Sequence, residues 1–113
     1  MAVFVDDMNC NYGRMKMCHM LADTDEELHA MAALIGVARK WWQSPEKASG
    51  SHYDVCLSKK ALALAAGAIP ITLRQAGSMN ARRRATGFLG SPDDAEAWLR
   101  ARTKAKAALR SER

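Results

Sequence analysis

The sequence has 113 residues, of which 49% are hydrophobic, and a formal net charge of +5. This length suits one domain with one hydrophobic core. No run reaches the roughly 18 uninterrupted apolar residues of a membrane-spanning helix, and the N-terminus lacks the basic region and apolar stretch of a secretory signal. We therefore expect a single soluble, cytoplasmic domain over residues 1–113, with no membrane partner.

The cysteine spacing and the charge distribution further limit the class of protein to which this sequence can belong. The three cysteines are odd in number and form no C-x-x-C pair, which argues against a disulfide framework and a thiolate zinc site. Residues 1–57 carry a net charge of −3 and residues 58–113 a net charge of +8. Such asymmetry is typical of proteins with anionic partners, although a basic C-terminal helix that complements its own dipole explains part of it equally well.

The first half of the chain predicts strands and one helix. Residues 2–5 are a short apolar run, and residues 15–23 form a second strand candidate. A helix should cover residues 25–35, because Thr24 precedes it as a cap and Gly36 follows it as a terminator. From residue 37 we expect a short strand, which becomes an exposed loop from residue 44.

The second half continues the alternation of strands and helices. A strand over residues 52–57 precedes a helix over 59–66, capped by Ser58, and a strand over 68–73 follows. A short basic helix is predicted over 79–86 and a long one over 92–109, which Ser91 should cap. The pattern predicts an α/β fold with a three- to five-stranded, at least partly parallel sheet, flanking helices and a C-terminal helix.

Four segments also carry a family resemblance: "VFVDDM", "CHMLADTDEELHAMAALIGVARKWWQ", "HYDVCLSKKALALAAGAIPIT" and the "RQ" that follows shortly after. In order and spacing they resemble a bacterial and phage family of unknown function, number four thousand and thirty-one in the domain-of-unknown-function series. The resemblance covers residues 1 to about 86 and leaves out the C-terminal helix and basic tail over 87–113. It implies a compact domain and no particular activity. The positions to which it draws attention are Asp6, Asp7, His19, Asp23, His29, Trp41, Gln43, His52, Tyr53, Asp54 and Arg74.

The first functional interpretation is a ligand pocket. In an open α/β sheet, ligands collect at the carboxyl ends of the strands, so polar residues from distant segments should converge there. We expect binding of a phosphorylated, nucleotide-like small molecule, which the protein sequesters or senses without a cofactor. A cation would contact phosphate, aromatic rings would stack on the base, and polar groups would contact its edges. The predicted pocket contains Asp6, His19, Trp41, Gln43, His52, Tyr53, Asp54 and Arg74, with both histidines and Asp54 close together.

Two other functions stay open at this point. The main alternative is a metal-dependent nuclease or phosphoesterase, in which Asp6, Asp23 and Asp54 hold a divalent metal ion. His19 and His52 could join Asp6 or Asp7 in such a site, although no close-spaced pair such as H-x-H or H-E-x-x-H supports it. The weaker alternative is a basic DNA-binding or assembly module that uses Arg82, Arg83 and Arg84 to contact nucleic acid.

Most of these side chains also have an ordinary structural interpretation. A histidine on a strand can simply donate to a buried carboxylate, and one of the adjacent residues Trp41 and Trp42 should pack inward. His29 should pack or form a cap contact rather than bind metal. The identity of the ligand, whether it is turned over, and the oligomeric state are not determined by these patterns.

Overall fold

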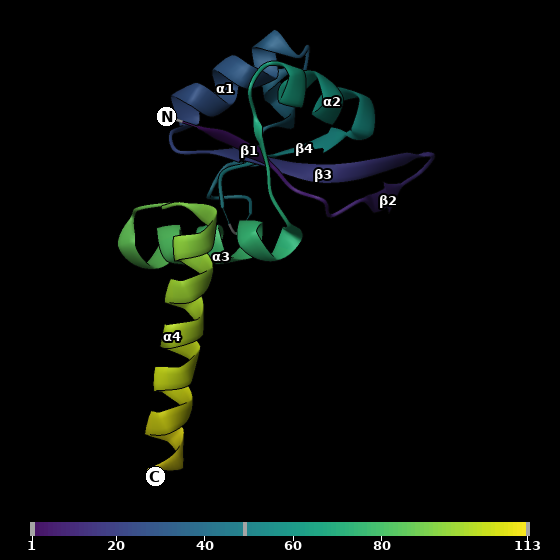
Figure 1. The fold of residues 1–113 in the computed structure, drawn as a ribbon. Coiled ribbons are helices and arrows are strands. Elements are labelled where there is room, and N and C mark those ends of the chain that lie inside the picture. The colour runs from purple at the N-terminus through teal and green to yellow at the C-terminus, as the bar shows by residue number, and fades with distance from the viewer. Residues whose placement is uncertain (1, 49, 113) are drawn as a thin grey trace.

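One long strand organises the sheet of this computed structural model, which describes residues 2–48 and 50–112 (Figure 1). This strand is β3 (Met15–Ala22). On one edge it pairs antiparallel with β1 (Val3–Val5) and then with β2 (Cys10–Tyr12). On its other edge it pairs antiparallel with β4 (Tyr53–Cys56). β5 (Ile69–Pro70) pairs parallel with β1, so the sheet is five-stranded and mixed.

Helices cover both faces of this sheet (Figure 1). The described helices are α1 (Asp25–Leu34), the 3-10 helix η1 (Arg39–Trp41), α2 (Leu57–Ala65), α3 (Leu73–Thr86) and α4 (Pro92–Ser111). α1 and α2 lie on one face and α3 on the other, where α4 projects away from the sheet. The predicted α/β class, first strand and long C-terminal helix are confirmed, and the first strand is internal because β3 and β5 flank it. None of the described helices is long and apolar enough to cross a membrane.

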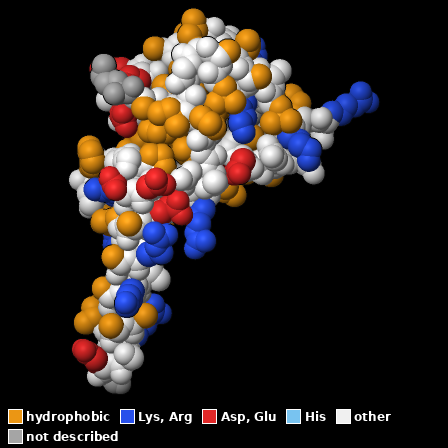
Figure 2. Space-filling model, in the orientation of Figure 1, with side chains coloured by type: hydrophobic (Ala, Val, Ile, Leu, Met, Phe, Trp, Pro, Cys, Tyr) orange, Lys and Arg blue, Asp and Glu red, His pale blue; other side chains and the backbone are white. Residues whose placement is uncertain are grey.

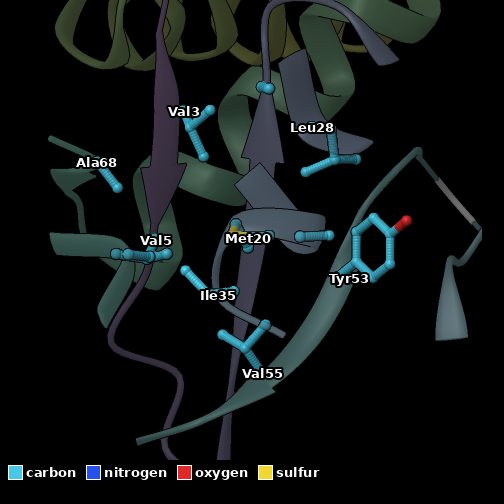
Figure 3. Close-up of a cluster of buried hydrophobic side chains, with 11 residues drawn as sticks. Val3, Val5, Met20, Leu28, Ile35, Tyr53, Val55 and Ala68 are labelled. Atoms are coloured by element: carbon cyan, nitrogen blue, oxygen red, sulfur yellow. The ribbon is translucent and has the colours of Figure 1, made fainter. Parts of the chain in front are cut away.

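The core beneath α1 and α2 follows from the alternation of side chains along the strands. Val5 of β1, Met20 of β3 and Tyr53 of β4 are fully buried on this face. They pack against Leu28 of α1 and Ala63 of α2, and Figure 3 shows part of this cluster.

A second apolar cluster lies on the opposite face. Phe4 of β1 and Leu21 of β3 pack there against Met79 of α3 and Ala95 of α4. His19 is two residues before Leu21 on the same strand, so its side chain points to this second face. The site described below therefore shares a face of the sheet with α3 and α4.

Local signals at several helix ends are confirmed. The Thr24 hydroxyl accepts a hydrogen bond from the backbone of Glu27, and the Ser91 hydroxyl accepts one from Asp94. Gly36 and Gly87 follow α1 and α3 with positive φ angles of 80° and 78°. A left-handed residue of this kind ends a helix at little cost only if it is glycine.

Several predicted boundaries are wrong, including that of the strand expected over 68–73, which is only Ile69–Pro70. α3 begins at Leu73 rather than at residue 79, because Thr72 and Gln75 form a reciprocal capping box. α2 begins at Leu57, which places Ser58 inside the first turn instead of at the cap. The strand expected from residue 37 is replaced by η1, and only Gln43 forms a bridge, with His52.

Candidate metal centre

Three side chains form a row across three adjacent strands on the α3 face of the sheet. Asp6 directly follows β1, and its backbone N–H donates to the carbonyl of His19 at 3.0 Å. His19 lies directly opposite Asp54 in the β3–β4 ladder. Directly opposed residues of an antiparallel pair project to the same side, and His52, two positions before Asp54, projects there as well. The sheet therefore brings together residues that 48 positions of sequence separate.

Asp6 holds the His19 ring in place. The Nδ1 atom of His19 is 2.7 Å from Oδ2 of Asp6, which is fully buried. Oδ1 of Asp6 accepts from the backbone N–H groups of His19 and Met8, and Lys60 Nζ donates to the Asp6 carbonyl at 2.8 Å. Burial by itself would raise the pKa of Asp6, but the bonds from His19 and Met8 outweigh it and lower that pKa. The bond to Asp6 in turn raises the pKa of His19.

A backbone carbonyl anchors the second histidine in the same way. Nδ1 of His52 is 2.6 Å from the carbonyl oxygen of Gly50. A carbonyl and a carboxylate oxygen only accept hydrogen bonds, so the Nδ1 atoms of both histidines must carry protons. In the neutral form of each ring, Nε2 then presents a lone pair, which is the state in which histidine binds a metal ion.

The free Nε2 atoms point toward one carboxylate oxygen. Oδ1 of Asp54 is 3.4 Å from Nε2 of His52 and 3.9 Å from Nε2 of His19. One ligand atom from each of these residues lies within 4.8 Å of the others. A tetrahedral ion with bonds of about 2.1 Å separates its ligand atoms by about 3.4 Å. Small side-chain movements would therefore suffice to hold a zinc-sized ion.

Asp54 has an unsatisfied oxygen at this point. Its Oδ1 atom is buried and, within the described chain, has no hydrogen-bond partner of good geometry. In its protonated form, the nearby His52 ring lowers the pKa of Asp54, which favours the ionised carboxylate. A buried anionic oxygen that accepts no well-formed hydrogen bond is costly, and a cation between it and the two Nε2 atoms would reduce that cost. We call His19, His52 and Asp54 the HHD cluster.

Other residues of the predicted pocket lie elsewhere. Tyr53 points to the opposite face, is fully buried, and hydrogen-bonds through its hydroxyl to Nδ1 of His29 at 2.8 Å. Trp42 packs inward beside His29, whereas Trp41 is 58% exposed on η1. Arg74 is exposed in the first turn of α3. Of the predicted pocket, the structure gathers Asp6, His19, His52 and Asp54, with Gln43 beside His52.

The predicted carboxylate set Asp6, Asp23 and Asp54 does not converge. Asp23 exchanges hydrogen bonds with Ala2 at the start of β1, whereas Asp6 follows the end of the same strand. Four residues of extended chain span about 13 Å. Because β1 and β3 are antiparallel, the residues that follow them lie at opposite edges of the sheet. The Asp6 carboxylate is also engaged by the His19 ring and by backbone N–H groups, so Asp6 lies beside the candidate ligand His19 and is not itself a candidate ligand.

The arginine run does not form one basic surface. Arg83 is partly buried and donates to the carbonyls of Ala22 and Ser51 at 3.2 and 3.0 Å, and burial lowers its pKa. Arg82 lies over the ring of Phe88. Successive residues of a helix point in different directions, so these neighbouring arginines have separate roles.

One sequence signal for the cluster was available in the spacing of its residues. His52 and Asp54 form an H-x-D pair on a predicted strand, and residues two apart on a strand share a face. This pair differs from the H-x-H and H-E-x-x-H spacings, which is why the sequence alone did not predict it as a pair of metal ligands. The third ligand, His19, depends on strand pairing, which local spacing does not reveal.

The fold and the site together define a small mixed α/β domain that carries two histidines and a carboxylate on one face of its sheet. Residues 3–83 match the family described as "Protein of unknown function (DUF4031)", and the chain belongs to this family. The matched region includes every residue of the HHD cluster and Asp6, and it ends within α3. No curated protein and no solved structure matches the chain significantly.

The Asp6–His19 pair predicts a distinctive pH dependence of stability in the metal-free protein. His19 has a pKa raised above 6.5, so its contribution is complete below pH 6.5 and is lost as pH rises through the raised pKa. Asp6 has a pKa lowered below 3.8, so its contribution is lost only as pH falls through that lower value. The pair should therefore stabilise the fold most between these limits.

Comparison of the wild type with Asp6→Asn measures this contribution. We expect the variant to lose about 1.5–3 kcal/mol of unfolding free energy near pH 5.5, the scale of a charge-assisted hydrogen bond. The loss should become smaller as pH rises through the raised pKa of His19, where the imidazole loses its charge. Urea denaturation with a chelator present provides the measurement. A difference that does not change with pH would contradict the proposed ion pair.

Proposed function

We propose that this protein binds a divalent transition-metal ion through the HHD cluster and hydrolyses a phosphate ester there. The observation that carries the proposal is the convergence of His19 Nε2, His52 Nε2 and Asp54 Oδ1. Imidazole and carboxylate ligands suit zinc, manganese and iron. Three protein ligands also leave coordination positions open for water and substrate, as catalytic sites require.

The residues around the cluster have defined supporting roles in this proposal. Asp6 orients His19 and the Gly50 carbonyl orients His52, and such outer contacts commonly tune metal affinity. The Asp54 side chain is 42% exposed, so a ligand can approach from solvent. A bound ion would lower the pKa of a coordinated water to about 7 and polarise a phosphoryl oxygen.

The hydrolysis itself uses only water and the ester. The oxygen of the attacking water forms a bond to phosphorus while the ester P–O bond breaks. The water gives up one proton, and the leaving oxygen gains one. The net charge of +8 over residues 58–113 favours an anionic substrate. A candidate substrate in this proposal is the phosphorylated, nucleotide-like molecule that we expect from the sequence.

Metal titration and hydrolysis assays test the proposal directly. Chelator-treated protein is titrated calorimetrically with Zn²⁺, Mn²⁺ and, without oxygen, Fe²⁺, and is assayed with bis(p-nitrophenyl) phosphate and a panel of nucleotides. We expect one of these ions to bind, and hydrolysis to stop on chelation and return when the ion is restored. Failure of all three ions to bind would overturn the metal site. Binding without hydrolysis of any ester would overturn the catalytic function alone.

A further inference from the structure

The outer part of α4 is basic and exposed. From Ala97 to Ser111 the helix carries five Lys and Arg residues and no carboxylate, and every residue from Arg100 to Glu112 is exposed. Figure 2 shows these cations along the projecting helix. The helix dipole favours cations only in the last turn, and α4 has one there, Arg110. The dipole therefore does not explain the four cations between residues 100 and 106.

Three of these cations form one stripe. Arg102, Lys106 and Arg110 are spaced four residues apart, so they lie on one side of the helix at intervals of about 6 Å. Arg102 and Lys106 also line a groove of about 350 Å³ between α3 and α4, together with Trp98 and Arg84. The guanidinium of Arg102 lies 5.1 Å from the centre of the Trp98 ring. Cations beside an aromatic ring are features that nucleic-acid strands contact.

The stripe lies on the same side of the sheet as the HHD cluster. Ala95 of α4 packs against Leu21 and Phe4, and His19 projects from the face of Leu21. Lys106 is 11 residues beyond Ala95, which is about 16 Å along the helix. A nucleic-acid strand advances about 3.4 Å per nucleotide. A ligand that contacts both the sheet face and Lys106 must therefore be about five nucleotides long or more.

We propose that Arg102, Lys106 and Arg110 bind the phosphate backbone of a nucleic acid, and that nucleic acid is the phosphate ester presented to the HHD cluster. The choice of substrate class rests on the proposed function, whereas the binding surface does not. Charge complementarity identifies the partner: a continuous polyanion matches a row of regularly spaced cations that no described part of this chain covers. α4 lies beyond the matched family region, so the family match does not include this proposed binding surface.

Binding can be measured separately from cleavage. Fluorescence anisotropy with labelled single- and double-stranded DNA of about 20 nucleotides, in the presence of chelator, reports affinity at several salt concentrations. We expect Arg102→Gln/Lys106→Gln to weaken binding at least about tenfold and to reduce the salt slope by about 2, because each phosphate contact contributes about 0.9. Circular dichroism checks that α4 remains helical.

A charge-matched variant on another side of the helix provides the control. Arg100→Gln/Lys104→Gln removes the same charge, and we expect it to weaken binding less than about threefold. Equal losses of DNA affinity in the two variants would show that the stripe is not the binding surface. The absence of DNA binding in the wild type would also overturn the proposal. Equally tight binding of phosphatidylglycerol vesicles would overturn nucleic acid as the specific partner.

The same variants separate this inference from the proposed function. Hydrolysis of bis(p-nitrophenyl) phosphate should fall no further in Arg102→Gln/Lys106→Gln than in the charge-matched Arg100→Gln/Lys104→Gln, because neither pair belongs to the HHD cluster and both remove the same charge. If the wild type hydrolyses this small ester but does not bind DNA, only the nucleic-acid inference fails. If it binds DNA through the stripe but binds no metal, the proposed function fails and the binding surface stands.

Discussion

His52→Gln and Asp54→Asn should each lower metal affinity and metal-dependent hydrolysis by at least about 100-fold. Each change removes one of three ligands, whereas loss of a residue that only orients a ligand typically costs about 10–100-fold. Neither side chain is part of the apolar clusters, so the fold should be retained. Calorimetric titration with Zn²⁺ or Mn²⁺ and hydrolysis of bis(p-nitrophenyl) phosphate measure the two effects.

The metal affinity of Asp6→Asn should lie between that of the ligand variants and that of the wild type. Asp6 contacts His19 at Nδ1 rather than at the ligand atom, so its loss should weaken metal binding about 10–100-fold. At a saturating metal concentration, Asp6→Asn should recover part of the wild-type rate of hydrolysis. His52→Gln and Asp54→Asn should not recover it.

His29→Gln is the matched control for the histidine changes. This histidine lies on the opposite face, where it bonds to Tyr53 and packs against Trp42. Its replacement should lower stability but leave metal affinity within about threefold of the wild type, a difference below 1 kcal/mol. If His52→Gln retains wild-type affinity, or if His29→Gln loses as much affinity as His52→Gln, the assigned ligand set is wrong.

Leu28→Ala should lower the free energy of unfolding by about 2–5 kcal/mol. Leu28 is 1% exposed and lies in the core cluster with Met20 and Tyr53, so truncation removes buried methyl groups and leaves a cavity. A domain of this size is typically stable by about 5–15 kcal/mol, which makes this a large fraction of the total. Urea denaturation followed by circular dichroism measures the change.

Leu34→Ala in the same helix is the control for this prediction. Leu34 is 70% exposed, and alanine is at least as good a helix former as leucine. Its effect should stay within about 0.5 kcal/mol. Similar losses at both positions would show that burial of Leu28 against the sheet is not the source of the stabilisation.

The sequence by itself determined those features of this protein that depend on local interactions. Both ends of α1 followed from Thr24 and Gly36, and the start of α4 followed from Ser91, because caps and left-handed terminators act on backbone groups within a few residues. The alternation along β4 likewise placed His52 and Asp54 on one face and Tyr53 on the other. That alternation already argued against a shared pocket for Tyr53 and Asp54.

Strand pairing was decided only by the tertiary structure, and with it the composition of the site. β1 and β3 pair antiparallel, which separates Asp6 from Asp23, and the register of β3 with β4 sets His19 opposite Asp54. Sequence periodicity states which face a side chain occupies but not which strand lies beside it. The neighbouring strand and its register depend on how the whole chain buries its apolar faces. The position of His19 beside Asp54, and its contact with Asp6, therefore emerge only in the folded sheet.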